Sequence, residues 1–113
     1  MKKTVPSSAF LKAIENAALA LNARDFQLSR EIIAGAMMMD MDAPEPHNLL
    51  GILYELMGDD GAARQHYRAA YALDPTYKPS CRNLERLVLY GWGATKGFDY
   101  GVPIAQEQDE NAN

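Results

Sequence analysis

Three side chains in this sequence are of types that often carry out chemistry: two histidines and one cysteine. Neither His47 nor His66 has a second metal ligand four residues away, so no zinc site is predicted. Cys81 lies on a predicted helix with an apolar face, where a thiol packs as an inert core residue. A cysteine nucleophile also needs a base and an orienting group, which the pattern does not supply. No strand is predicted, so no glycine-rich phosphate loop follows one. The sequence therefore predicts no catalytic residue, no metal and no cofactor.

The two histidines are expected to have separate structural roles. His47 lies near the start of a predicted helix, where a large ring packs in a partly buried position. His66 follows Gln65 on the next predicted helix, away from its apolar residues, and is interpreted as a solvated surface residue.

Two arginines are the best candidates for ligand binding. Arg82 and Arg86 lie one turn apart on a predicted helix over 79–90, and such a pair can bind a carboxylate through several hydrogen bonds. The alternative is that they pair with Glu55, with Glu85 or with solvent.

The elements that position these residues are helices with recognisable ends. Pro44-Glu45-Pro46 opens one helix, because proline and acidic residues suit a first turn. Gly58 ends it, and Asp59-Asp60 cap the next helix, which Asp74-Pro75 terminates. Apolar residues recur every three or four positions, which predicts one buried face on each helix. The inward residues are expected to be Leu50, Leu53, Tyr54, Met57, Ala63, Tyr67, Ala70 and Tyr71.

Eight residues between positions 44 and 77 follow the spacing of a tetratricopeptide (TPR) repeat, W-x2-L-G-x2-Y, then A-x3-F, then P. They are His47, Leu50, Gly51, Tyr54, Ala63, Tyr67, Ala70 and Pro75. The segment therefore resembles the TPR family, with His47 in the tryptophan slot as the main departure. This resemblance implies an all-α, TPR-like α-solenoid with right-handed superhelical stacking, a scaffold that presents surfaces to other chains.

The same frame extends in both directions along the chain. Residues 8–43 resemble a degenerate repeat, capped by Ser7-Ser8 and Asp25, whose signature slots keep mainly small residues. Those slots hold Asn16, Ala17, Ala20, Ser29, Ile33, Ala36 and Met41. Residues 79–90 match a first repeat helix, with Leu84, Leu87, Val88 and Tyr90 as apolar positions and Arg82, Asn83, Glu85 and Arg86 as its polar outer side. The prediction is five antiparallel helices over 7–91, in two repeats and a capping helix.

The ends of the chain differ from the helical part. Residues 1–6 are expected to be a flexible N-terminus, and residues 92–113 an irregular tail, glycine-rich and aromatic at first and then acidic. The polar stretch 106–113 has no apolar face and is predicted to be disordered. The earlier tail is too apolar for an idle linker: Trp92, Phe98, Tyr100, Val102, Pro103 and Ile104. They either pack back on the nearest helix pair or dock into a groove on this or another subunit.

The TPR resemblance also implies where a partner binds, because the first helix of each repeat lines the concave groove. The positions implied for this groove are Leu11, Ile14, Ala18, Leu21, Asn48, Ile52, Glu55, Leu56, Arg82, Arg86 and Leu89. TPR domains that capture the C-terminal carboxylate of chaperones carry Lys and Asn where this chain has Ile14 and Ala18, and Asn48 alone does not restore that site. An amphipathic or mixed apolar–acidic peptide fits this groove better.

Length and charge bound the remaining possibilities. The 113 residues suit one domain, and a net charge of −4 without a basic run argues against nucleic acid or an anionic membrane as partner. A single cysteine excludes an intramolecular disulfide. Lys2-Lys3 resembles the start of a signal peptide, but polar residues interrupt the apolar core that should follow. No segment approaches the roughly 20 apolar residues of a membrane span. The cytoplasm is the expected compartment.

These observations favour a non-catalytic protein–protein interaction module that presents a groove to a peptide or protein. The alternative is a small chaperone or adaptor that shields an apolar segment of a client, as the acidic, dimeric TPR chaperones of bacterial secretion do. Two repeats and a cap fall short of the roughly three repeats that a small solenoid needs. A docked tail, a homodimer or a larger partner is therefore expected to cover the exposed apolar surface.

Overall fold

Five α-helices account for most of the computed structural model, which describes residues 5–91 and 97–104. They are α1 (Ser8–Asn22), α2 (Phe26–Met39), α3 (Glu45–Leu56), α4 (Asp60–Leu73) and α5 (Lys78–Tyr90). No strand occurs in the described ranges, so the all-α prediction is confirmed there. The expectations for Trp92, for residues 106–113 and for most of the N-terminal segment 1–6 fall outside the described residues.

Local side-chain chemistry fixes where these helices begin and end. Ser7, Asp25 and Asp59 cap α1, α2 and α4, each accepting a hydrogen bond from a backbone N–H three residues later. Gly58 and Gly91 follow α3 and α5 with φ of 85° and 62°, a conformation that glycine adopts without strain. The predicted caps and stops are thereby confirmed.

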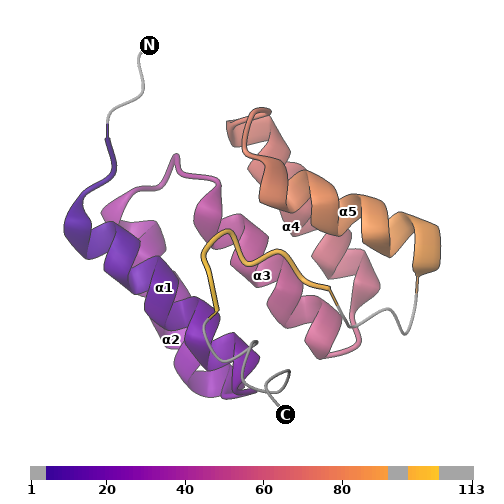
Figure 1. Cartoon of the computed structure of the whole chain (residues 1–113), viewed down its shortest axis with the longest axis horizontal. Coiled ribbons are helices and arrows are strands. Elements are labelled where there is room, and N and C mark those ends of the chain that lie inside the picture. The colour runs from indigo at the N-terminus through magenta and orange to yellow at the C-terminus, as the bar shows by residue number, and fades with distance from the viewer. Residues whose placement is uncertain (1–4, 92–96, 105–113) are drawn as a thin grey trace.

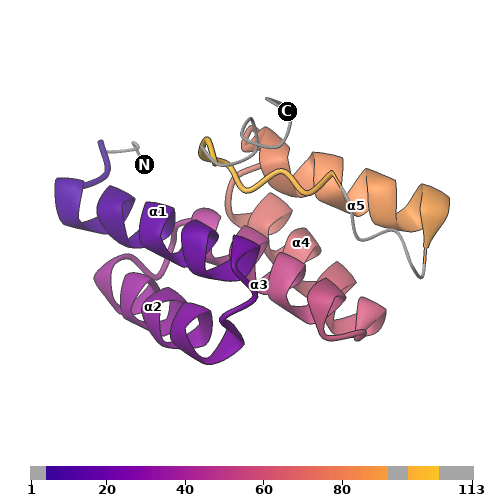
Figure 2. The same cartoon turned by 60° about the horizontal axis from the view of Figure 1, so that its bottom comes forward.

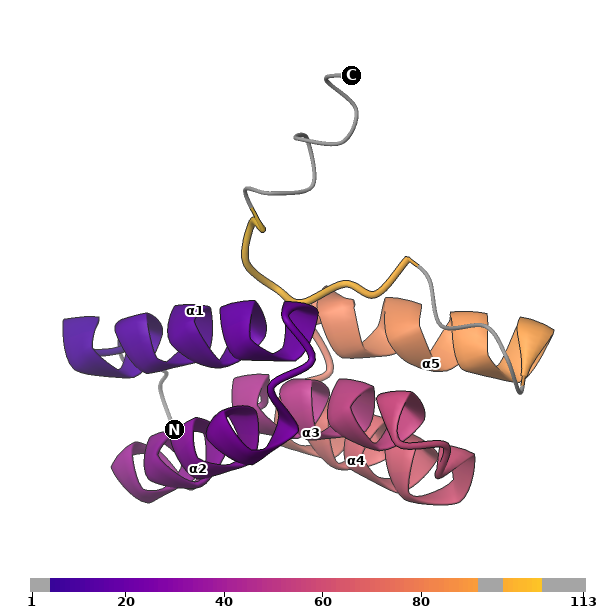
Figure 3. The same cartoon turned by 90° about the horizontal axis from the view of Figure 1, so that it is seen from below.

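The helices pack in pairs along the molecule. α1 packs against α2, α3 against α4, and α4 against α5, while α3 also contacts α1, α2 and α5 (Figure 2). Residues 97–104, called the tail segment below, cross in front of α3 between α1 and α5 (Figure 1). Figure 3 shows the tail segment on the side of α1 and α5, with α2 and α4 on the opposite side.

One continuous apolar core joins all five helices and the tail segment. Its largest members are Phe10, Ile14, Leu21, Ile33, Leu49, Ile52, Leu53, Tyr67, Leu87, Tyr100 and Ile104. The last two belong to the tail segment, so a region expected to lie outside the helical domain shares the core of that domain. The tail segment packs on its own chain, and it contacts α1 and α3 as well as α5 rather than only the nearest helix pair.

Four residues predicted to face inward are instead between 47% and 71% exposed: Met57, Tyr71, Val88 and Tyr90. Met57 follows the last residue of α3, and Tyr71 is rotated by one position from the buried Ala70 on α4. Val88 and Tyr90 lie in the last turn of α5. The periodic spacing of apolar residues predicts the helices correctly. It does not show how far along each helix a neighbouring element covers the side chains, and these four residues are therefore exposed.

The contact between α3 and α4 is tightest at Gly51. A Cβ atom added at Gly51 would overlap the ring of Tyr67, which is fully buried. Gly51 therefore allows the Tyr67 ring to lie directly against the backbone of α3. This pair occupies two of the eight spaced positions that carry the TPR resemblance.

We expect Gly51→Ala to lower the free energy of unfolding by about 1–3 kcal/mol, the usual cost of forcing atoms into a packed contact. Gly35→Ala is the matched control, because Gly35 also lies inside a helix but has no atom within 4 Å of an added Cβ. That control should raise stability by about 0.5–1 kcal/mol through helix propensity. Urea unfolding followed by circular dichroism measures both changes, and equal effects of the two substitutions would contradict the packing argument.

Candidate functional site

The tail segment alternates between covered and uncovered side chains. Tyr100 and Ile104 are 5% and 7% exposed, and Phe98 and Val102 pack partly buried against the core. The intervening residues Gly97, Gly101 and Pro103 are exposed, and Asp99 is half-buried. Alternation with a period of two is the pattern of an extended chain that has one face covered. Residues 97–100 therefore lie on the helices as an extended peptide would, and the chain bends at Gly101 and Val102.

Two buried asparagines bind the main chain of Asp99. The Asn83 carboxamide accepts a hydrogen bond from the Asp99 backbone N–H at 2.8 Å and donates one to its carbonyl oxygen at 2.9 Å. Asn48 donates to the same carbonyl oxygen at 3.0 Å, and Asn83 also donates to the Asn48 side-chain oxygen at 2.8 Å. Both main-chain polar groups of one residue are thus satisfied by side chains of α3 and α5, whatever the side chain at that position.

Two arginines of α5 contact side chains of the tail segment. Arg82 donates to an Asp99 carboxylate oxygen at 2.9 Å, at the solvent-exposed edge of the contact. The Arg86 guanidinium lies 4.8 Å from the ring centre of Phe98, within the range of a cation–π interaction. One arginine therefore contacts an acid and the other an aromatic ring.

Arg86 is held in place by a buried carboxylate beneath it. Its two terminal nitrogens donate to the two Glu55 oxygens at 3.0 and 2.6 Å, and the Tyr67 hydroxyl donates to Glu55 at 2.6 Å. Burial raises the pKa of Tyr67, and the charge of Glu55 raises it further. Burial alone would lower the pKa of Arg86, but the hydrogen bonds and charge of Glu55 raise it overall. The phenol and the guanidinium therefore both stay protonated and donate to Glu55.

The remaining contacts surround Tyr100. Its hydroxyl lies 3.4 Å from the side-chain oxygen of Asn22 at the end of α1, and its ring meets Phe98 edge to face. The next residue, Gly101, has φ of 81°, and a Cβ atom there would overlap the hydroxyl of Tyr77. Burial raises the pKa of Tyr77, as do the nearby Glu45 and Asp99 carboxylates, so this phenol also stays protonated. We call the residues that contact the tail segment the tail site: Asn22, Asn48, Tyr77, Arg82, Asn83 and Arg86.

The tail site includes some of the residues predicted to line the groove. Asn48, Arg82 and Arg86 contact the tail segment directly, and Glu55 supports Arg86 from below. The expectation that the two arginines together bind one carboxylate is wrong. Arg86 is already paired with Glu55, as the alternative anticipated, and only Arg82 reaches the acid of the tail segment.

The aliphatic positions of the predicted groove are mostly core residues. Ile14, Ala18, Leu21 and Ile52 are fully buried, so none of them offers an open surface. Leu56 is partly buried against the core. The fully buried residues face the interior because residues about one turn apart on a packed helix share its buried face.

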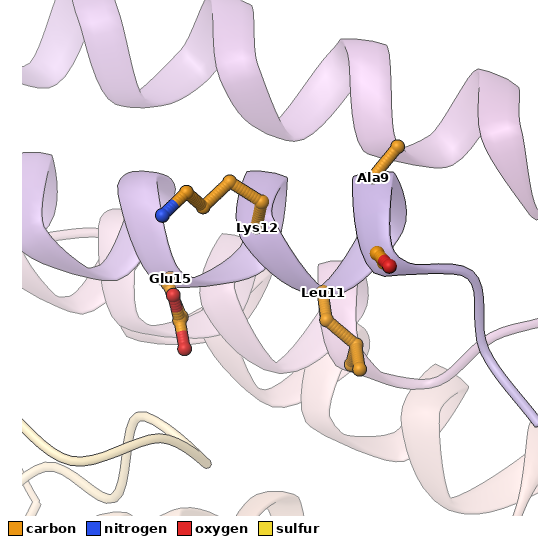
Figure 4. Close-up of a pocket in the computed structure, with 5 residues that line it drawn as sticks. Ala9, Leu11, Lys12 and Glu15 are labelled. Carbon is orange, nitrogen blue, oxygen red and sulfur yellow. The ribbon is translucent and has the colours of Figure 1, made fainter.

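Leu11 and Leu89 are exposed and lie away from the tail contacts described above. Leu11 lines a shallow hollow on α1 together with Ser8, Ala9, Lys12 and Glu15 (Figure 4). All five residues come from one helix, so the hollow brings no groups together from different elements. Leu89 lies near the end of α5.

The prediction that Asn83 lies on the polar outer side of α5 is wrong. Ser80, Asn83 and Leu87 are the buried residues of α5, at helical spacing along one face. That spacing is visible in the sequence, but an asparagine is taken as exposed unless a partner for its amide is known. The alternation of apolar residues from 98 to 104 is the other signal present in the sequence that the prediction did not use.

The two histidines lie side by side, which corrects the expectation that His66 is solvated. Their Nδ1 atoms are 3.1 Å apart, and the His66 ring also stacks on Tyr54. A hydrogen bond between these nitrogens requires one of them to be unprotonated. Burial lowers the pKa of both rings, and the charge of His47 lowers that of His66 further. No three His, Cys, Asp or Glu side chains of the described residues gather to hold a metal ion.

No known protein family, curated protein or solved structure matches this chain. Within the described part of the chain, none of the helices is both long and apolar enough to cross a membrane. At the tail site, side chains from three helices and the α4–α5 connection meet one segment of the chain.

We expect Gly101→Ala to destabilise the protein more than Gly97→Ala. Both glycines have φ near 80°, so either alanine costs about 1–2 kcal/mol in backbone strain. Only the alanine at 101 also overlaps a neighbour, Tyr77, which should cost a further 1–3 kcal/mol or so. Urea unfolding gives the two free energies, and NMR signals of the Tyr100 ring report whether the tail segment stays bound. Equal costs would contradict the close approach of Gly101 to Tyr77.

Stability should fall as the pH drops below about 6.5, the ordinary pKa of histidine. The folded-state pKa of His47 and of His66 is lowered, so the unfolded chain binds protons more readily in this range. The stabilisation is therefore fully present above the unfolded pKa and is lost as the pH falls through the folded one. His66→Gln should flatten this dependence between about pH 7.5 and about pH 5.5 in urea unfolding. Parallel profiles for the variant and the parent would contradict this assignment.

Proposed function

We propose that this chain is a non-catalytic protein-interaction module that binds an extended peptide segment at the tail site. One observation carries the proposal: the buried Asn48 and Asn83 amides satisfy both main-chain polar groups of Asp99. Such contacts recognise an extended backbone as such, which is how an interaction domain accepts segments of another protein. Neighbouring side-chain contacts then select among sequences.

The helix arrangement supports a TPR-type scaffold for this site. Gly51 and Tyr67 lie at the contact of α3 with α4, where the repeat spacing requires a small residue against a ring. Ala63 and Ala70 are fully buried on the same helix as Tyr67. We propose that α1 to α4 form two antiparallel repeats and that α5 caps them, in a short right-handed solenoid. In that arrangement α1, α3 and α5 are the first helices of successive repeats, and the tail site lies on them.

The chemistry of the tail site suits binding. Its polar contacts to the tail segment come from carboxamides and guanidinium groups, which are hydrogen-bond donors. These groups fix the position and direction of a chain. We propose a cytoplasmic protein or peptide as the partner, with no cofactor.

A second candidate is an adaptor that shields an apolar segment of a client protein or of a second copy. Val88, Leu89 and Tyr90 favour it, because these three consecutive residues at the end of α5 are all more than 60% exposed. Consecutive helical residues point in different directions, so these side chains are spread around the end of α5. An apolar helix end that is exposed to solvent is a candidate surface of association. This surface belongs to the end of α5 and is separate from the contacts of the tail segment.

Site-specific photocrosslinking in the native cell tests both candidates. A photoreactive amino acid is placed at Arg82 on the edge of the tail site, at Val88 near the end of α5, or at Arg68 on α4. Arg68 is the control, because it is exposed and α4 lies on the side opposite the tail segment (Figure 3).

We expect covalent adducts with a partner protein from Arg82 and none from Arg68, with mass spectrometry identifying the crosslinked segments. Combining the Arg82 probe with Asn83→Ala should reduce these adducts several-fold, since the main-chain hydrogen bonds are lost. Adducts from Val88 alone would support the second candidate. Adducts from Arg68 as abundant as those from Arg82 would overturn the tail site as the binding surface.

A further inference from the structure

The contacts of the tail segment define the chemistry that the tail site accepts. We propose that the site is specific for an extended segment with an aspartate between two aromatic residues and a glycine after the second. We also propose that the tail segment competes with such a partner intramolecularly. This inference rests on the proposed function and specifies the ligand of the same site.

The acidic preference comes from Arg82. Its guanidinium donates to the Asp99 carboxylate at 2.9 Å, while Asp99 also accepts from the backbone N–H of Gly101 at 3.0 Å. The Arg82 side chain is 65% exposed, so the ion pair itself adds little affinity. A basic residue at this position would instead face a like charge and lose the hydrogen bond to its own backbone. Selectivity therefore comes from rejection of the wrong charge as well as from attraction.

The aromatic preference comes from surfaces that exist before the ligand arrives. Glu55 holds the Arg86 guanidinium 4.8 Å from the ring centre of Phe98, so this cation–π contact requires little ordering of the arginine on binding. Tyr100 is buried beside Phe98, and its hydroxyl reaches the side chain of Asn22. A buried aromatic ring with a partner for its hydroxyl is the type of residue that dominates binding energy at interfaces.

The glycine preference is steric. At Gly101 the positive φ disfavours any other residue, and a Cβ atom would overlap the Tyr77 hydroxyl. Phe98, Asp99, Tyr100 and Gly101 thus form a consecutive recognition sequence in which each residue meets a different feature of the site.

The tail segment is bound by the same chain that carries the site, which makes it a competitor for any external ligand. In the sequence, only a few residues separate the end of α5 from the tail segment. A short linker between a site and its ligand gives an effective ligand concentration on the order of millimolar. An external peptide of equal intrinsic affinity must overcome that concentration, so weakening the tail segment should strengthen binding of the peptide.

A fluorescence-anisotropy titration with a labelled synthetic peptide of residues 97–104 tests the competition. The full-length parent is compared with full-length Tyr100→Ala, which removes the most buried ring of the tail segment and leaves the site unchanged. We expect the variant to bind the peptide at least about tenfold more tightly than the parent. Equal affinities, with both proteins folded by circular dichroism, would overturn the role of the tail segment as a competitor.

The same titration tests specificity with a second peptide that carries Asp99→Arg. In the Tyr100→Ala protein, the native peptide should bind at least about fivefold more tightly than the Asp99→Arg peptide. Adding Arg82→Asp to the protein should reverse this order, whereas adding Arg68→Asp on α4 should leave it unchanged. An order that Arg82→Asp does not reverse would overturn recognition of the acid by Arg82.

If Tyr100→Ala does not fold, the single variant Arg82→Asp replaces it as the protein with a weakened tail segment. Arg82 is largely exposed, so this change leaves the core intact while it places two carboxylates together. It should then bind the Asp99→Arg peptide more tightly than the native one, because the native peptide meets a like charge. Failure of both peptides to bind any folded variant overturns this inference, while the crosslinks in the native cell decide the proposed function independently.

Discussion

One buried carboxylate, that of Glu55, connects the framework of this protein with its tail site. It accepts hydrogen bonds from Tyr67 on α4 and from Arg86 on α5, so three successive helices meet at one group. A buried charge is stable only when its partners are in place, and removing one partner of such a pair costs about 3–5 kcal/mol. The relative positions of α3, α4 and α5 are therefore coupled through Glu55. The same carboxylate orients the guanidinium that lies beneath Phe98.

The arrangement around Glu55 in turn depends on the absence of a side chain at Gly51. The Tyr67 ring lies against the α3 backbone at this glycine, and from there its hydroxyl reaches Glu55 one turn further along the helix. Backbone shape, ring packing and a buried hydrogen bond thus form one continuous structure. The Arg86 guanidinium, which Glu55 holds, is the part of the tail site that contacts Phe98.

The tail segment serves both as part of the core and as an occupant of the tail site. Tyr100 and Ile104 are buried with residues of the helices, which a chain of only five short helices needs in order to cover its apolar surface. Yet the segment is held through hydrogen bonds and side-chain contacts that a segment of another protein could equally make. A ligand that displaces it must therefore bury comparable apolar surface. This requirement links the affinity of the site to the stability of the domain.

Much of the fold could be predicted from the sequence because the signals are local. Ser7, Asp25, Asp59 and Gly58 act on backbone groups within a few residues, and the spacing of Gly51 and Tyr67 specifies their contact within one pair of helices. The alternation from 98 to 104 was also available in the sequence. Which groups become partners over longer distances was decided only by the tertiary structure. Asn48 meets Asp99 across 51 positions, and Arg86 meets Glu55 across 31. Before folding, each of these side chains has several candidates of suitable charge or hydrogen-bonding capacity, and only the packing of α1, α3 and α5 brings one of them within reach.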